Sequence, residues 1–186
     1  MAQMHTPEPK IGSRAHPFSL LGVDGKTHTL QSCRGPLGVL VVFICNHCPY
    51  VQALRDRLAA DMKDIQKTGV GVVAICSNDP ADYPEDSYEN LRKQAKAWGF
   101  TFPYLHDESQ LVARTYGAVC TPDFFGYNAN LELHYRGRLD PAQRGPRTPD
   151  MKRELVDAMA QIARTGKTSA QQVPSMGCSI KWRDIR

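Results

Sequence analysis

Two apolar runs constrain the fold of this 186-residue chain more than any other feature. Residues 37–44 read LGVLVVFI, and residues 70–76 read VGVVAIC. Both runs are too short to cross a membrane, and valine-rich runs of this length are typical of strands buried on both faces of a sheet. Between them, Leu54, Leu58 and Met62 recur at helical spacing. A strand, a helix and a strand of these lengths predict a βαβ unit with parallel strands.

The flanking segments predict a mixed sheet with helices on both of its faces. Two short strands are expected around a turn at residues 24–25, before the βαβ unit. After it, residues 88–98 have the pattern of a helix, and residues 123–138 that of a β-hairpin. A last helix is expected to begin with Thr148 as its N-cap and to end at Gly166.

Length and composition fit one globular domain. Hydrophobic residues make up 41% of the chain and charged residues 23%, which is ordinary for such a domain. We expect this domain to cover residues 1–166, with residues 1–15 as a loose arm. Residues 167–186 are polar and are expected to form a C-terminal tail that packs on or near the domain.

Location and large partners follow from charge and hydropathy. The N-terminal stretch has no apolar core of signal-peptide length, and no segment reaches the length of a membrane span. We therefore expect a cytoplasmic protein that does not bind a membrane. The net charge is +4, but lysine and arginine are scattered, so we expect no nucleic-acid partner.

The segment FICNHCPYVQAL places Cys45 and Cys48 where the first apolar strand gives way to a helix. In open α/β sheets, ligands and chemistry collect at the carboxyl ends of strands. Free N–H groups and the helix dipole favour a thiolate there, and two cysteines three positions apart can close a disulfide. A protonated His47 would lower the pKa of the sulfur further; the alternative is a solvated residue on the first helical turn.

Other interpretations of the cysteine pair fit less well. A haem attachment motif has histidine directly after the second cysteine, and Pro49 stands there. A structural zinc site usually takes four ligands from two paired motifs, and the sequence has a single pair. Unreactive core cysteines belong in the middle of a strand rather than at a strand-to-helix turn. The acidic run at residues 79–86 is explained by helix capping and solvation. We expect no metal and no cofactor.

Five segments together resemble the peroxiredoxin-like (AhpC/TSA) branch of the thioredoxin superfamily. They are CNHCPYV at 45–51, SNDPADYPEDSYENL at 77–91, YGAVCTPDFFGYN at 116–128, YRGRLD at 135–140 and PSMGCSIKW at 174–182. The resemblance implies an α/β, thioredoxin-like fold, with a central mixed sheet flanked by helices and an N-terminal β-hairpin extension. It also implies that Pro122 is a cis-proline facing the sulfurs, rather than a trans-proline at a strand start. The backbone of Thr121 would then be exposed beside the sulfurs to position an extended substrate.

The resemblance leaves the order of attack open. In thioredoxins the more exposed N-terminal cysteine, here Cys45, attacks, and Cys48 resolves the mixed disulfide. In peroxiredoxins the cysteine before a proline, here Cys48, meets the peroxide. The peroxiredoxin motif has a threonine or serine at the place of Cys45 and a proline at the place of Val41. The arginine of that family is replaced by the region of Thr121. The usual hydrogen-bonding cradle for a peroxide is therefore incomplete.

These patterns give one leading hypothesis and two alternatives. The leading hypothesis is a thiol–disulfide oxidoreductase in which Cys45 and Cys48 cycle between dithiol and disulfide. The alternatives are a thiol-dependent antioxidant peroxidase using Cys48, and a non-catalytic redox-sensing binding module. The expected partner is a protein or small-molecule disulfide or thiol, or a hydroperoxide; the sequence predicts no oligomeric state.

Two further cysteines are candidates for redox chemistry. Cys178 could fold back as a third redox cysteine, or be an idle thiol on a tail anchored by Ile180 and Trp182. Cys120 stands two positions before Pro122 and could lie near the site, or be a small core residue.

Overall fold

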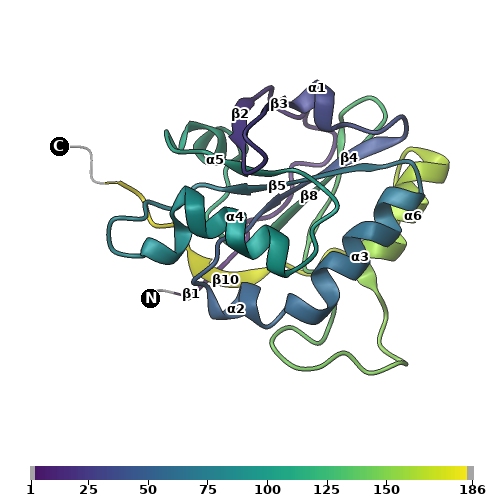
Figure 1. The fold of residues 1–186 in the computed structure, drawn as a ribbon. Coiled ribbons are helices and arrows are strands. Elements are labelled where there is room, and N and C mark those ends of the chain that lie inside the picture. Colours follow the sequence, from purple (N-terminus) through teal and green to yellow (C-terminus); the bar gives the residue numbers. More distant parts are fainter. Residues whose placement is uncertain (1–2, 184–186) are drawn as a thin grey trace.

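A mixed sheet of seven strands organises the fold, which a computed structural model describes for residues 3–183. Its strand order is β3-β2-β6-β5-β4-β8-β9 (Figure 1). The strands are β2 (Ser19–Gly22), β3 (Thr27–Thr29), β4 (Gly38–Phe43), β5 (Gly71–Cys76), β6 (Tyr104–His106), β8 (Asp123–Asn128) and β9 (Leu133–Gly137). β4 and β5 pair in parallel, while β8 and β9 form an antiparallel hairpin at the sheet edge. The predicted βαβ unit and hairpin are both confirmed.

Helices cover both faces of this sheet. They are α1 (Leu30–Cys33), α2 (Pro49–Gln52), α3 (Arg55–Lys67), α4 (Tyr88–Ala97), α5 (Leu111–Tyr116) and α6 (Glu154–Thr165), with a 3-10 turn η1 (Pro84–Asp86) before α4. Residues of α3, α4 and α6 share one apolar core, and residues of α1 and α5 share the other. Figure 1 shows α3 and α4 in front of the sheet and α1 at its upper edge.

Strand β4 contributes to both cores, as its continuous apolar sequence predicts. Leu40 and Val42 lie in the core under α3, whereas Val41 and Phe43 lie in the core under α5. All four side chains are at most 1% exposed. Because side chains alternate between the faces of a strand, a strand in the middle of two cores must be apolar at every position. β4 is therefore held firmly in the sheet up to Phe43, and Cys45 follows two residues after its end.

A second, smaller sheet joins the two ends of the chain. Its order is β1-β10-β7, with β1 (Gln3–His5), β10 (Met176–Ser179) and β7 (Cys120–Thr121), and β10 runs antiparallel to both neighbours. Figure 1 shows β10 in yellow, with β1 next to it. The expectation of a loose N-terminal arm is therefore wrong for β1, because its backbone is paired residue by residue with β10.

The last helix begins at Glu154 rather than next to Thr148, so the predicted N-cap is wrong. The side chain of Thr148 bonds to Asp150 instead. Ion pairs hold the preceding loop against α3: Arg147 lies 2.6 Å from Asp61, and Arg153 lies 2.5 Å from the same carboxylate. These contacts fix the loop in a non-helical path up to Arg153.

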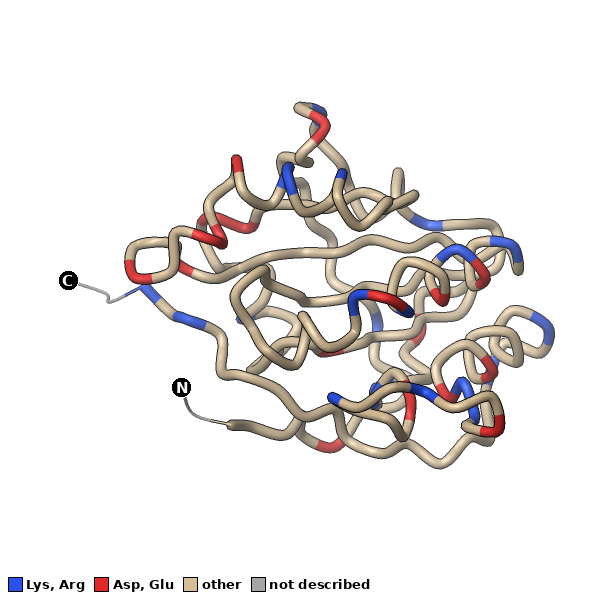
Figure 2. The backbone as a smooth tube through the Cα atoms, turned by 60° about the horizontal axis from the view of Figure 1, so that its bottom comes forward, with Lys and Arg blue, Asp and Glu red and all other residues tan. Residues whose placement is uncertain are grey.

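Charges of both signs are distributed along the whole described chain (Figure 2). Several of them form buried ion pairs, such as Arg136 with Asp123 at 2.8 Å. Among residues 3–183, no helix combines the length and the apolar character that crossing a membrane requires.

Candidate active site

Cys45 and Cys48 lie between the end of β4 and the start of α2. Cys48 is the N-cap residue of α2, and Pro49 is the first helical residue, which suits a position whose N–H has no partner inside the helix. Both cysteines are free thiols, and both are 0% exposed. The expectation that Cys45 is the more exposed sulfur is therefore wrong, because the small sheet covers the pair.

Thr121 connects the two sulfurs. Its hydroxyl lies 3.2 Å from Cys45 Sγ, and its carbonyl oxygen accepts a hydrogen bond of 3.1 Å from the Cys48 thiol. The peptide bond between Thr121 and Pro122 is cis, as the resemblance implied. The structure thus brings together Cys45, Cys48, Thr121 and Pro122, although the two halves of this cluster are more than 70 positions apart in the sequence.

The backbone of Thr121 is not exposed beside the sulfurs, contrary to expectation. Thr121 is 2% exposed, and its backbone pairs with Cys178 of β10. The reason is that the edge of β7 is already occupied by a strand of the same chain. A pocket of about 30 Å³ beside Pro122 is walled by Ser175 and Met176, at the start of that strand.

The two sulfurs share one proton unequally. The Cys45 thiol donates to the Cys48 sulfur and lowers the pKa of Cys48 to about 5, and the backbone N–H groups of Val51 and Cys178 act in the same direction against the effect of burial. Burial and the negative Cys48 sulfur raise the pKa of Cys45 well above its usual value. The carbonyl of Thr121 accepts the Cys48 proton and so opposes ionisation of Cys48. This single acceptor is outweighed by the groups that donate to the Cys48 sulfur and lower its pKa. The thiolate therefore resides on Cys48.

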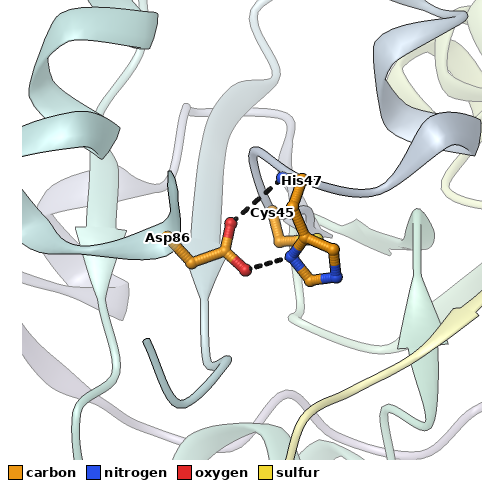
Figure 3. A group of neighbouring side chains, drawn as sticks. All are labelled: Cys45, His47 and Asp86. Carbon is orange, nitrogen blue, oxygen red and sulfur yellow. Dashed lines mark hydrogen bonds and ion pairs between the residues drawn. The ribbon is translucent and has the colours of Figure 1, made fainter. Parts of the chain in front are cut away.

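His47 is held by Asp86, from the 3-10 turn η1. His47 Nδ1 lies 2.5 Å from Asp86 Oδ2 (Figure 3). The imidazole also stacks on Tyr83, with ring centroids 4.1 Å apart. Among the described residues, Nε2 of His47 is buried and has no hydrogen-bond partner. The imidazole is not among the main influences on the pKa values of Cys45 and Cys48. The structure places His47 near Cys45, and its predicted pKa-tuning role stays a prediction.

Asp86 is the residue that sequence reasoning missed. The sequence suggested capping and solvation, but Ser87 is the N-cap residue of α4, and Asp86 is 0% exposed. Burial alone would raise the pKa of Asp86, yet hydrogen bonds from His47 and Asn78 outweigh it and lower the pKa. A usable signal did exist. The loop that carries Asp86 follows β5, and the carboxyl ends of neighbouring parallel strands meet at one edge.

Cys45, His47 and Asp86 offer three potential metal-ligand atoms within 4.8 Å of one another. Zinc accepts sulfur, imidazole and carboxylate ligands. However, both oxygens of Asp86 are fully engaged: Oδ1 accepts from the backbone N–H groups of Asn46 and His47, and Oδ2 from the His47 imidazole and the Asn78 amide. A metal would have to displace these donors. The cluster is therefore better suited to orient an imidazole beside a sulfur.

The other two cysteines differ in their relation to the pair. Cys178 pairs with Thr121, whose carbonyl bonds to Cys48, and Cys178 is 4% exposed; its backbone and thiol lower the pKa of Cys48. Cys120 lies on β7 with 0% exposure, and burial raises its pKa strongly. Of these two cysteines, only Cys178 is among the groups that lower the pKa of Cys48.

Comparison with known proteins gives both a family and a fold. A family model described as "AhpC/TSA family" matches residues 11–140. The thiol-disulfide oxidoreductase ResA of Geobacillus thermodenitrificans is 28% identical over 120 residues, which span 64% of each protein. The solved structure of an uncharacterized conserved protein from Geobacillus kaustophilus is 39% identical, with a TM-score of 0.91, and the match covers 98% of this chain and 97% of that one.

A more distant structure identifies the fold. The thioredoxin domain of a thiol-disulfide oxidoreductase from Bacteroides vulgatus superposes with a TM-score of 0.57 at 16% identity, over 69% of this chain and 89% of that one. The predicted thioredoxin-like α/β fold is therefore confirmed.

Proposed function

Because the chain belongs to the AhpC/TSA family, we propose that it is a thiol–disulfide oxidoreductase in which Cys45 and Cys48 cycle between dithiol and disulfide. The observation that carries this proposal is the contact of both sulfurs with one residue, Thr121, directly before the cis-proline. Two thiols held against the same residue and sharing one proton can close a disulfide with little backbone movement. The similarity to a protein named thiol-disulfide oxidoreductase supports the same reaction.

In the proposed reaction, Cys48 attacks first. Its pKa of about 5 makes it a thiolate at neutral pH, while Cys45 keeps its proton. The Cys48 thiolate attacks a substrate disulfide, forms a mixed disulfide and releases the first substrate thiolate. Cys45 then attacks the Cys48 sulfur, which closes the Cys45–Cys48 bond and releases the second substrate thiolate. Two electrons pass from the dithiol to the substrate.

The second step requires Cys45 to lose its proton, and we assign this transfer to His47. Asp86 accepts a hydrogen bond from Nδ1 of His47, which leaves the lone pair on Nε2 as the base. A ring nitrogen of His47 lies within 4.8 Å of Cys45 Sγ, and the transfer requires that Nε2 reach this sulfur through one bridging water. The hydroxyl of Thr121 can donate to the thiolate that results. Asp86 acts here as a positioning residue.

The proposed substrate is a protein or small-molecule disulfide. The proposed location is a reducing compartment such as the cytoplasm, where the free thiols of this chain would persist. Because both sulfurs are 0% exposed, substrate must approach through a movement of the small sheet or through the pocket beside Pro122.

The oxidoreductase proposal is tested by mapping disulfides and measuring turnover. The reduced protein is oxidised with oxidised glutathione, its remaining thiols are alkylated after denaturation, and the cross-linked peptides are identified by mass spectrometry. We expect a Cys45–Cys48 disulfide and catalytic reduction of a peptide disulfide by the wild type, with turnover lost in Cys45→Ser and in Cys48→Ser. A wild type that forms no disulfide involving Cys48 would overturn the proposal.

A second candidate function is a thiol peroxidase that uses Cys48. The low pKa of Cys48 and the adjacent Pro49 favour it. Against it, the threonine or serine and the proline of the peroxiredoxin motif are replaced here by Cys45 and Val41, so the hydrogen-bonding cradle for a peroxide is incomplete. Stopped-flow mixing with hydrogen peroxide separates the two: rapid consumption that survives in Cys45→Ser and disappears in Cys48→Ser would favour the peroxidase.

A further inference from the structure

The strand β10 carries a thiol into the active site. Cys178 pairs with Thr121 in an antiparallel register, so that β10 lies along the same backbone edge that an extended substrate would need. The Cys48 sulfur bonds to the carbonyl of the same Thr121, and Cys48 and Cys178 each shift the pKa of the other. A cysteine of this chain thus stands where the cysteine of an extended substrate would stand.

We propose that Cys178 is a third redox-active cysteine, which exchanges disulfide partners with Cys48. The proposal rests on the cycle of Cys45 and Cys48 proposed above. It assigns to the C-terminal segment a chemical role in addition to its structural one. The geometry that carries it is the convergence of three thiols around Thr121, each at most 4% exposed. Two of them come from the segment between β4 and α2, and the third comes from β10.

The exchange needs no external oxidant. It starts from the Cys45–Cys48 disulfide, in which Cys48 has one sulfur bond. The Cys178 thiolate attacks Cys48 Sγ, the Cys48–Cys178 bond forms, and the Cys45–Cys48 bond breaks. Cys45 leaves as a thiolate and takes up the proton that Cys178 gave up. The number of disulfides and the number of electrons are unchanged.

Oxidation of the pair itself prepares Cys178 for attack. In the reduced protein, burial and the neighbouring Cys48 sulfur raise the pKa of Cys178 to about 11. Once Cys48 is in a disulfide it has no negative charge, so the part of this rise that is due to Cys48 is removed. Lys181 lowers the pKa of Cys178 and continues to do so in the oxidised state. Cys178 therefore becomes a better nucleophile only when there is a disulfide to attack.

The product has a defined consequence for the site. The Cys48–Cys178 disulfide ties β10 covalently to the start of α2, and it frees the Cys45 thiol next to His47. The oxidised protein would then exist as two isomers, one with β10 bound only by hydrogen bonds and one with β10 covalently attached.

The test uses the full chain and the variant Cys45→Ser. This variant retains five of the six cysteines. After oxidation with oxidised glutathione, acid quenching and alkylation with N-ethylmaleimide under denaturing conditions, we expect only three alkylated cysteines and a cross-linked peptide pair containing Cys48 and Cys178. The matched control is Cys45→Ser/Cys120→Ser, which we expect to form the same link because Cys120 takes no part in it.

The outcomes distinguish this inference from the proposed function. If Cys45→Ser yields five alkylated cysteines, or glutathione on Cys48 with Cys178 alkylated, while the wild type forms Cys45–Cys48, the role of Cys178 is refuted and the oxidoreductase proposal stands. If the double variant loses the link, Cys120 is the partner and the role of Cys178 is refuted as well. If the wild type forms no disulfide with Cys48, the proposed function is refuted, and the role of Cys178, which rests on it, is refuted with it. A Cys48–Cys178 link in the wild type and in both variants supports the inference.

Discussion

Gly177 lies so close to Thr121 that a Cβ atom on Gly177 would stand 1.9 Å from the Thr121 carbonyl oxygen and 2.5 Å from the carbonyl carbon. No other residue type can occupy this place without moving the backbone, because a real Cβ does not approach backbone atoms so closely. The carbonyl in question also accepts the hydrogen bond of the Cys48 thiol. The docking of β10 and the environment of the sulfur therefore depend on the same atom.

The first prediction is that Gly177→Ala opens the active site. The added methyl group forces β10 away from β7, so that both sulfurs, which are 0% exposed in the wild type, become accessible. We expect alkylation of Cys48 by iodoacetamide under native conditions to accelerate by at least about tenfold. This factor corresponds to about 1.4 kcal/mol of lost packing between β10 and β7, which is within the usual range for a single substitution.

Gly145→Ala is the matched control for this prediction. The nearest atom to its new Cβ would be 3.3 Å away, and its backbone is not left-handed, so alkylation should match the wild type. An unchanged alkylation rate in a folded Gly177→Ala protein would mean that β10 does not cover the sulfurs in solution.

The second prediction concerns the charge on Cys48. Its pKa of about 5 predicts that the ultraviolet absorbance of the thiolate appears as pH rises through 5, far below the 9.0 of an ordinary thiol. In Cys45→Ala the midpoint should move upward, since the strongest hydrogen-bond donor to the thiolate is removed. Stability follows the same sign: the thiolate's contribution is complete above the pKa of the unfolded thiol and is lost as pH falls through 5.

Cys48→Ala provides the control, because the transition near pH 5 must disappear with the residue that titrates. Persistence of that transition in Cys48→Ala would assign the thiolate to another cysteine, and an unchanged midpoint in Cys45→Ala would mean that the Cys45 thiol is not its hydrogen-bond donor.

The third prediction is that Asp86→Asn slows resolution of the mixed disulfide. The amide group of asparagine turns an N–H toward either His47 Nδ1 or Asn78, so the tautomer with a free Nε2 is no longer enforced. We expect the rate of peptide-disulfide reduction to fall about 100-fold, the lower end of the usual range for a positioned acid–base group. The KM should be unchanged, and the loss should diminish at high pH, where Cys45 ionises without a base.

Asp82→Asn is the control for Asp86→Asn, since Asp82 belongs to the same loop but is exposed. A rate loss of the same size in both variants, or one that does not depend on pH, would point to a structural effect of the loop rather than to positioning of His47.

Local sequence patterns were sufficient where a single segment decides the structure. The valine-rich runs predicted β4 and β5, and the spacing of Cys45 and Cys48 located the site, because strand burial and the strand-to-helix turn are visible in consecutive residues. The cis bond before Pro122 followed from resemblance rather than from any pattern in composition.

Long-range contacts account for what the sequence did not predict. Asp86 reaches His47 from 39 positions away, and β1 and β10 pair with segments at the other end of the chain. Neither QMH nor MGCS alternates in a way that marks a strand, so their pairing depends on the surface that the rest of the fold presents. The burial of Thr121 depends on that same pairing.

The last prediction concerns the ion-pair network that fixes the loop before α6. Asp61 is 0% exposed and holds Arg147 and Arg153 at 2.6 and 2.5 Å. Removal of one partner from a buried ion pair leaves the others without compensation, so Asp61→Asn should lower the free energy of unfolding by about 3 kcal/mol, the lower end for such pairs because the arginines are partly exposed. In a chain of this length that corresponds to a decrease in Tm of roughly 6–12 °C, measured by calorimetry.

Asp64→Asn is the control. The Asp64 side chain is 35% exposed and also pairs with Arg153, so its replacement should lower the free energy of unfolding by less than about 1 kcal/mol. Equal losses in the two variants would mean that burial of Asp61 is not what makes the network stabilising.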